Sequence, residues 1–505
     1  MANQLFAKKP VSLLLSEMEG GHRLRRVLGP VQLTNLGVGA IIGAGIFVVT
    51  GLVARDKAGA AIMLSFVVAG FACAFAALCY AEFASMVPVA GSAYTYAYAT
   101  LGEFFAWVIG WDLILEYGVG AASVAHGWSH YFTDFLRILG IHLPSIFTNA
   151  PFDFDPALGK IVSTGALIDL PAFLVAAAIT IVLVLGIRES ATFNAIMVAL
   201  KLTVVLLVIA IGVFYVDPKN WKPFAPYGYS GISFFGHTIL GQSGVGGEPL
   251  GVIAGAAIIF FAYIGFDAVS THAEEARNPS RDVPIGILAS LTLCTVLYIA
   301  VSAVLTGMVP YNQIDIDAPI AKAFSQVGLP WVHFFISVGA LTGITSVLMV
   351  LLLSQPRIML AMARDGLLPA SSFAAVHHRF QTPWKSTMLT GTVVGLMAAL
   401  MPLRILAELV NVGTLLAFIF VCSAVLIMRR LDPAAERPFR CPMVPLVPIL
   451  GIGFCLLLMF SLPWENWLRL IVWLLLGFAV YFSYGRHHSI LARRANGELH
   501  APERA

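Results

Sequence analysis

The sequence predicts an all-α polytopic membrane protein with about twelve transmembrane helices, and three observations support this fold class. Hydrophobic residues make up 59% of the 505 residues and charged residues only 11%, whereas a soluble domain carries about 25% charged residues. The mean hydropathy is +0.87. The apolar residues gather into about twelve runs, most of them near the roughly 20 residues that one bilayer span requires.

Each predicted helix coincides with one apolar run. The third and eighth runs are longer than a bilayer requires, which indicates tilt or extension into water. The ninth and tenth runs nearly touch at Pro402, so the boundary between them rests on this proline. The predicted helices are 32–51, 60–86, 97–131, 167–187, 192–215, 251–274, 284–309, 332–363, 384–402, 404–430, 443–462 and 465–484.

The placement of lysine and arginine predicts the orientation. With the N-terminus inside, cytoplasmic segments and their adjoining helix ends hold roughly 20 of the 30 Lys and Arg, as the positive-inside rule requires. An even number of helices then places the C-terminal tail inside as well. The predicted organisation is a cytoplasmic segment 1–31, a first repeat 32–215 (helices 1–5), an extracellular loop 216–250, a second repeat 251–430 (helices 6–10), helices 11 and 12 in 443–484 and a cytoplasmic tail 485–505.

Two glycine-broken stretches, Gly39–Phe47 and Phe260–Asp267, open the two predicted repeats. Glycine in a helix costs about 1 kcal/mol relative to alanine, and it lets the backbone leave the helix. An opened backbone survives in hydrocarbon only where protein buries it or where it lines a wet cavity. Two interruptions at matching places in two halves of a chain indicate the substrate site of a transporter.

The physics of a broken helix suggests the substrate class. The amides that begin a half-helix suit a carboxylate, and the carbonyls of a facing break suit an ammonium group. Gly43, Ala44 and Gly45 are small enough for close approach. Two crossed breaks therefore favour the zwitterionic head of an α-amino acid over a sugar.

Lys201 is the most unusual ionisable residue. It lies about ten residues from each end of the fifth predicted helix, roughly 14 Å from either interface, so its amine must face the bundle interior. Burial there favours the uncharged amine, which could lose and regain a proton during a cycle. The alternative is a permanently charged lysine locked to a carboxylate, with Glu116 as a plausible partner.

Three carboxyl groups inside predicted helices are candidate functional groups. Asp267, beside the second break, could take up a proton, contact a cationic substrate or stabilise freed backbone amides. Asp112 and Glu116 share one helix face, and two carboxylates so close in a low dielectric should not both ionise cheaply. A proton relay and a structural ion pair both stay open. Glu82 and Glu103 lie near helix ends, where a solvated or dipole-pairing role is expected.

Other features exclude several function classes. His126 and His130 share a helix face but lack an HExxH pattern, so no metal site and no cofactor are expected. The six cysteines are scattered, and the net charge of +3 is too small and dispersed to suggest nucleic acid. The charged clusters 274–281 and 357–365 are predicted to form cytoplasmic anchors and gate salt bridges.

Seven segments, distributed between about residues 25 and 485, carry a family resemblance. They resemble the amino acid–polyamine–organocation superfamily and, within it, the bacterial members of the cationic amino acid transporter family. The matching segments are Gly39–Phe47, Pro88–Tyr94, Gly110–Tyr117, Lys201, Phe260–Pro279, Ser354–Gly366 and Glu408–Ala417.

The resemblance implies a five-plus-five inverted-repeat core, with helices 1 and 6 broken, followed by two further helices. It also implies proton-coupled uptake of L-amino acids. By position, the amides of Ala44 and Gly45 would bind the substrate carboxylate. The amine would be bound by the carbonyls of Ile41, Phe261, Ala262 and Ile264, and the Phe261 ring would act as an occlusion gate.

The resemblance also assigns the coupling residues. Lys201 matches a basic residue that replaces a sodium site, Asp267 and Glu116 match acidic residues linked to coupling, and Thr345 and Ser346 fall near the sodium-ligand region of sodium-coupled relatives. Vertebrate members of the family carry fourteen helices rather than twelve. A preference for cationic over neutral amino acids therefore does not transfer to this sequence.

The resulting prediction is a permease of the plasma or inner membrane that imports L-amino acids by proton-coupled symport with alternating access. An amino acid exchanger and a non-transporting amino acid sensor are the alternatives. The expected partners are the amino acid and membrane lipid, and a small membrane accessory subunit stays an open alternative. A membrane enzyme or a channel would require a clustered catalytic motif or a filter repeat, and the sequence shows neither.

Overall fold

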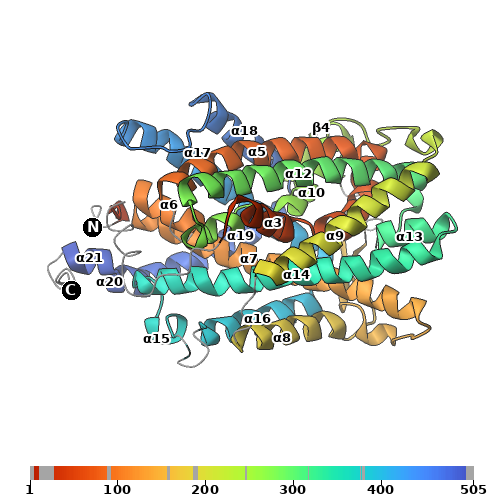
Figure 1. Cartoon of the computed structure of the whole chain (residues 1–505), viewed down its shortest axis with the longest axis horizontal. Coiled ribbons are helices and arrows are strands. Elements are labelled where there is room, and N and C mark those ends of the chain that lie inside the picture. Colours follow the sequence, from red (N-terminus) through yellow and green to blue (C-terminus); the bar gives the residue numbers. More distant parts are fainter. Residues whose placement is uncertain are drawn as a thin grey trace.

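The computed structural model is an elongated bundle in which most long helices run along the long axis (Figure 1). Both described ends of the chain lie at one end of the bundle, here called the terminal end, and three short β-hairpins lie at the other, here called the hairpin end. The structure describes residues 5–10, 28–87, 92–155, 160–185, 191–244, 247–316, 318–375, 377 and 382–495.

Helical structure occupies all twelve predicted ranges within the described residues. Eight stretches are long and apolar enough to cross a membrane, and α8 and α18 are shorter apolar helices. The helices are α3 Pro30–Ile41, α4 Thr50–Val53, α5 Ile62–Met86, α6 Ser92–Thr100, α7 Glu103–Ile138, α8 Leu170–Val184, α9 Ala191–Gly212, α10 Val252–Ile259, α11 Ala268–Thr271, α12 Pro279–Met308, α13 Pro319–Gln326, α14 Pro330–Arg364, α15 Ala370–Phe373, α16 Trp384–Leu400, α17 Leu403–Leu431, α18 Leu446–Phe460, α19 Trp464–Val480, α20 Arg486–His488 and α21 Ile490–Ala495.

Burial separates inner from outer helices. In the spans Glu103–Ile138 and Val252–Thr271, 94% of the residues in the 18-residue apolar stretch of each span are buried inside the protein. The corresponding share is only 28% in Ala195–Tyr215 and 22% in Trp464–Arg493. The apolar faces of the outer helices are therefore left for lipid, as expected of a membrane protein. The broken helices lie inside, with α3 packed on α12, α9 and α14.

The predicted start of the third helix, at residue 97, is wrong, because two separate helices, α6 and α7, cover the predicted range 97–131. α6 ends at Thr100 and α7 begins at Glu103, with Gly102 between them at φ +107°. The chain near the N-terminus fills this break, since a Cβ at Gly102 would lie 2.7 Å from the carbonyl carbon of Phe6. The Glu103 amide donates to the Ala7 carbonyl at 3.0 Å. Because this contact joins segments almost 100 residues apart, no pattern in the sequence around Gly102 could predict the break.

Three antiparallel hairpins, which the sequence did not predict, lie in the loops of the hairpin end. The predicted loop 216–250 contains two of them, and it is tied to the first broken helix because the Gly251 amide donates to the Lys57 carbonyl at 2.9 Å. The pairs are β1 Phe152–Asp155 with β2 Lys160–Ser163, β3 Ile232–Phe234 with β4 His237–Leu240, and β5 Gln242–Ser243 with β6 Pro249–Leu250.

Of the two roles expected of Glu82 and Glu103, the solvated one is wrong, because both side chains are buried. Glu103 does lie in the first turn of α7, where a carboxylate suits the helix dipole. Glu82 is 2% exposed and accepts two hydrogen bonds from Arg429, at 2.9 and 2.7 Å, with Arg437 at 3.3 Å. Glu103 accepts from the hydroxyls of Tyr98 and Tyr481. Both carboxylates join the ends of distant helices.

Glu82→Ala should lower the melting temperature of the purified protein, because it leaves the Arg437 guanidinium buried without its carboxylate. Removing one partner of a buried ion pair costs about 3–5 kcal/mol. Glu436→Ala, at an exposed position in the following loop, is the control and should change little. Equal melting temperatures for the two variants would contradict the assignment.

Candidate functional site

The first broken helix opens at residues 42–44. α3 ends at Ile41, Ile42 takes an extended conformation (φ −74°, ψ 102°), and a π-helical turn, Gly45–Val49, continues the helix. The first amides of a helix have no partner within it, and no side chain caps this turn. The break therefore presents amide donors next to small residues, as predicted for Gly43, Ala44 and Gly45.

The second broken helix opens after α10. A 3₁₀ turn, Phe260–Tyr263, is followed by Ile264 (ψ 134°) and by Gly265 at φ +114° before α11 begins. A positive φ of this kind favours glycine. The Nδ2 amide of Asn411 donates to the carbonyls of Ala257 and Ile258 at 2.7 and 3.0 Å and so holds the end of α10.

The two breaks cross in direct backbone contact. A Cβ at Gly45 would lie 2.3 Å from the Cα of Ala262, and a Cβ at Gly265 would lie 2.9 Å from the Ala40 carbonyl oxygen. The Tyr298 hydroxyl lies between them, 2.8 Å from the Ile41 carbonyl and 3.0 Å from the Ala262 carbonyl. The two sequence stretches that were predicted to face one another do so.

The structure places all seven predicted substrate residues at this crossing, and all are buried. The single O–H of Tyr298 lies within hydrogen-bond distance of the Ile41 and Ala262 carbonyls, and the Phe261 carbonyl accepts from the Ile264 amide at 3.3 Å. A carbonyl has two lone pairs, so each can accept another. The Phe261 ring, the predicted gate, is 6% exposed.

Lys201 lies beside the first break rather than beside a carboxylate. Its ammonium donates to the carbonyls of Gly39 at 2.7 Å and Ile42 at 3.0 Å and to the Ser346 hydroxyl at 2.8 Å. These bonds use all three N–H donors of a lysine, so the predicted partnership with Glu116 is wrong. Thr345 faces elsewhere and accepts from the Trp128 indole at 3.0 Å.

The three carboxyl groups gather beside the second break. Asp267 is 1% exposed and accepts from the Tyr117 hydroxyl at 2.7 Å. Both oxygens of Asp112 and of Glu116 lack a hydrogen-bond partner among the described residues. Glu116 lies within electrostatic range of the other two acids. An isolated buried carboxylate is costly, so this group requires a proton or a cation.

Sequence reasoning missed Tyr298 and Asn411. Both side chains are fully buried and bind backbone carbonyls freed by the breaks. Their only local signal is a polar group within an apolar run, which many packing residues share.

An ion-pair network closes the hairpin end above the crossing. Glu248 pairs with Lys57 and, at 2.7 Å, with Arg404, which also binds Glu408 at 3.0 Å. Burial alone would raise the pKa of Glu248, but Lys57 and Arg404 outweigh burial and hold this pKa below its ordinary value. The four side chains line a cavity of about 440 Å³. Of the four, only Glu408 falls in a segment that carries the family resemblance.

A second set of ion pairs lies at the terminal end. Arg357 on α14 approaches Glu275 at 3.9 Å, so the two predicted charge clusters do meet. Asp365 binds Lys9 at 2.9 Å and the Tyr94 hydroxyl at 2.6 Å. A buried crossing of two broken helices thus lies between charged contacts at both ends.

A family model for amino acid permeases matches residues 28–480. The chain belongs to the amino acid permease family. The resemblance inferred from the sequence is thereby confirmed. The protein is a multi-pass membrane transporter rather than an enzyme.

Relatives of this permease differ in the substrates that their names give. The branched-chain amino acid permease of Bacillus subtilis (strain 168) is 48% identical over 97% of this chain and 100% of its own length. The methylthioribose transporter of the same strain is 45% identical over 97% of this chain and 99% of its own length. Human cationic amino acid transporter 4 is 32% identical over 92% of this chain and 88% of its own length.

Gly45→Ala should abolish transport by this permease, because its methyl group would push apart the backbones at the crossing. Overpacking of this kind costs about 1–3 kcal/mol. Uptake into proteoliposomes and the melting temperature would be measured together. Gly453→Ala is the matched control, since a Cβ there meets no atom within 4 Å. Normal uptake by Gly45→Ala would remove the close crossing from the mechanism.

Proposed function

We propose that this permease imports L-amino acids by proton-coupled symport with alternating access in the cell membrane, both termini being cytoplasmic. The carboxylate of the substrate accepts hydrogen bonds from the amides of Ala44 and Gly45. The ammonium group of the substrate donates to the remaining lone pairs of the carbonyls at the crossing of the two breaks. The helices before and after each break move relative to one another, so the site faces each side of the membrane in turn. The predicted five-plus-five repeat supports this movement.

The Lys201 ammonium is the observation that carries the coupling proposal. Carbonyl and hydroxyl oxygens of the kind that bind a monovalent cation surround it, and no water-filled gap separates it from them. A second cation about 4 Å away would be repelled by several kcal/mol in a site of low dielectric. Sodium is therefore disfavoured as the coupling ion.

Loss of a proton from Lys201 would act directly on the first break. A neutral amine has two N–H donors and one acceptor lone pair, so it cannot donate to Gly39, Ile42 and Ser346 at once. Ile42 lies within the break itself. Protonation would hold the broken helix against α14, and deprotonation would release it. This gives the proton a mechanical role in the transport cycle.

The acids beside the second break offer a second proton site. Glu116 lies within electrostatic range of both Asp267 and Asp112, and all three acids are buried with at least one carboxyl oxygen that has no hydrogen-bond partner among the described residues. A proton taken up there would lower the cost of burial and would alter the bond from Tyr117 to Asp267. The two proton-binding places would thus flank the substrate on the two broken helices.

Neutral amino acids are the favoured substrates. The side chains beside the breaks include Ile41, Phe261, Ile264 and Val347, which all are apolar. The name of the 48% identical relative, a branched-chain amino acid permease, agrees with this class. A competition panel of twenty amino acids in proteoliposomes tests it, and stronger competition by arginine and lysine than by neutral amino acids would overturn it.

Lys201→Ala should abolish amino acid accumulation driven by an inward proton gradient while leaving part of the substrate binding intact. The variant removes the donor that links protonation to the first break. Accumulation in proteoliposomes and binding by calorimetry would be compared with Lys385→Ala, which removes an exposed lysine. Full proton-driven accumulation by Lys201→Ala would contradict the coupling proposal. A sodium requirement for accumulation by the unmodified protein would contradict it as well.

Asp267→Asn should make uptake insensitive to the proton gradient, because an amide mimics the protonated acid and still accepts from Tyr117. Counterflow, in which labelled substrate exchanges against internal substrate without a gradient, should persist. Asp432→Asn, at an exposed carboxylate, is the control. Counterflow without gradient-driven accumulation by the unmodified protein would identify an exchanger instead, and binding without any uptake would identify a sensor.

A further inference from the structure

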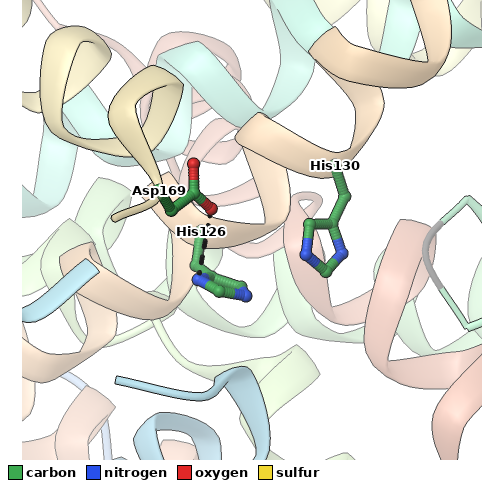
Figure 2. Close-up of side chains that lie close together, drawn as sticks. All are labelled: His126, His130 and Asp169. Atoms are coloured by element: carbon green, nitrogen blue, oxygen red, sulfur yellow. Dashed lines mark ion pairs between the residues drawn. The ribbon is translucent and has the colours of Figure 1, made fainter. Parts of the chain in front are cut away.

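Two histidines of α7 meet an aspartate at the start of α8, close to the hairpin end. Figure 2 shows His126 below Asp169, joined to it by the dashed line, with the His130 ring to the right of both. One ligand atom from each residue lies within 4.8 Å of the other two. His126 is 4% exposed and Asp169 is fully buried. The spacing of the histidines alone did not predict a metal site, because the third residue comes from another helix.

Asp169 is held with one oxygen directed at the histidines. Its Oδ1 accepts from the Ser129 hydroxyl and, at 3.1 Å, from the Ala172 amide, so the carboxylate is fixed as the cap of α8. Its Oδ2 has no hydrogen-bond partner among the described residues. A buried carboxylate oxygen without a hydrogen bond is costly, its ion-pair neighbour being the His126 ring at 3.5 Å, and a bound cation would satisfy it.

The separation of His126 and Asp169 fits shared coordination. Nδ1 of His126 lies 3.5 Å from Oδ2 of Asp169, which is too long for a strong hydrogen bond. Two ligands of one tetrahedral zinc ion, each bonded at about 2.0–2.1 Å, lie about 3.4 Å apart. His130 lies on a partly exposed turn of the same helix, and its side chain would turn toward the other two ligands to complete the set.

A cavity gives ions and water a route to this place. His126 and His130 line a cavity of about 410 Å³, together with Asp56, Asp153 and Arg404. The two additional carboxylates make the surroundings favourable for a cation. The one guanidinium in the lining is engaged by Glu248 and Glu408. Water from the cavity would fill the fourth coordination position.

We propose that His126, His130 and Asp169 bind one divalent transition-metal ion. Imidazole nitrogens with a carboxylate oxygen are typical zinc ligands, and a set of three with an open position accommodates zinc without a fourth protein group. The ion links α7 to the first turn of α8. Nδ1 of His126 lies 3.1 Å from the Ala398 carbonyl at the end of α16, to which it donates in the metal-free chain. Metal binding displaces this proton from Nδ1 and leaves the imidazole protonated at Nε2. The site is separate from the crossing of the broken helices.

Zinc titration of the full chain, purified without a polyhistidine tag and measured by calorimetry, tests the proposal. The unmodified protein should bind one zinc ion that His130→Gln and Asp169→Asn each bind at least about tenfold more weakly, because even partners behind a ligand change metal affinity 10–100-fold. His130→Cys should retain binding, since a thiolate can replace the imidazole. His142→Gln, at an exposed histidine in the loop that follows α7, should bind zinc like the unmodified protein.

A direct readout keeps the test independent of transport. Cobalt in place of zinc should give the visible absorption of a tetrahedral site in the unmodified protein and in His142→Gln, and this absorption should be lost in His130→Gln. Zinc binding that is absent, or equal in all variants, would overturn the proposal and leave His126 and Asp169 as an ion pair. Melting temperatures without metal would identify a variant that has merely failed to fold.

Discussion

The structure depends on the satisfaction of backbone groups that two broken helices release inside a membrane protein. Carbonyls freed by an interruption cannot turn to water in hydrocarbon, so side chains from neighbouring helices must bind them. Lys201 binds Gly39 and Ile42, and Tyr298 joins Ile41 to Ala262. Each of these bonds comes from a helix that is itself continuous. Continuous helices therefore stabilise the two interruptions at the positions where their side chains bind the freed carbonyls.

This arrangement joins stability to function. The groups that stabilise the breaks are also those whose protonation or movement would change them, so one lysine can support the fold and respond to a proton gradient. The ion pairs at the two ends contribute in a different way. Partly exposed pairs such as Arg357 with Glu275 are worth little, which suits contacts that form and break in a cycle. The deeply buried carboxylate of Glu82 instead belongs to the permanent scaffold.

Predictions from the sequence succeeded where a local pattern has a local physical cause. Apolar runs gave the helices, and glycines within two of them gave the breaks at Gly43 and Gly265. Predictions failed where a distant segment decides the outcome. The break at Gly102 requires Phe6 to pass beside it, and the solvated role expected of Glu82 ignored the arginines that approach it. The metal-ligand geometry at His126 likewise required Asp169 from another helix.

The sequence by itself determined that the chain is a helical membrane protein, that two helices are interrupted and which family it resembles. Composition and residue spacing along a helix carry this information, because both are properties of neighbouring residues. Only the tertiary structure decided the partners of the buried polar groups. Lys201 and Gly39 are 162 residues apart, and Arg429 and Glu82 are 347 apart. Several acceptors were compatible with the lysine, and the packing of α9 against α3 and α14 selected one set.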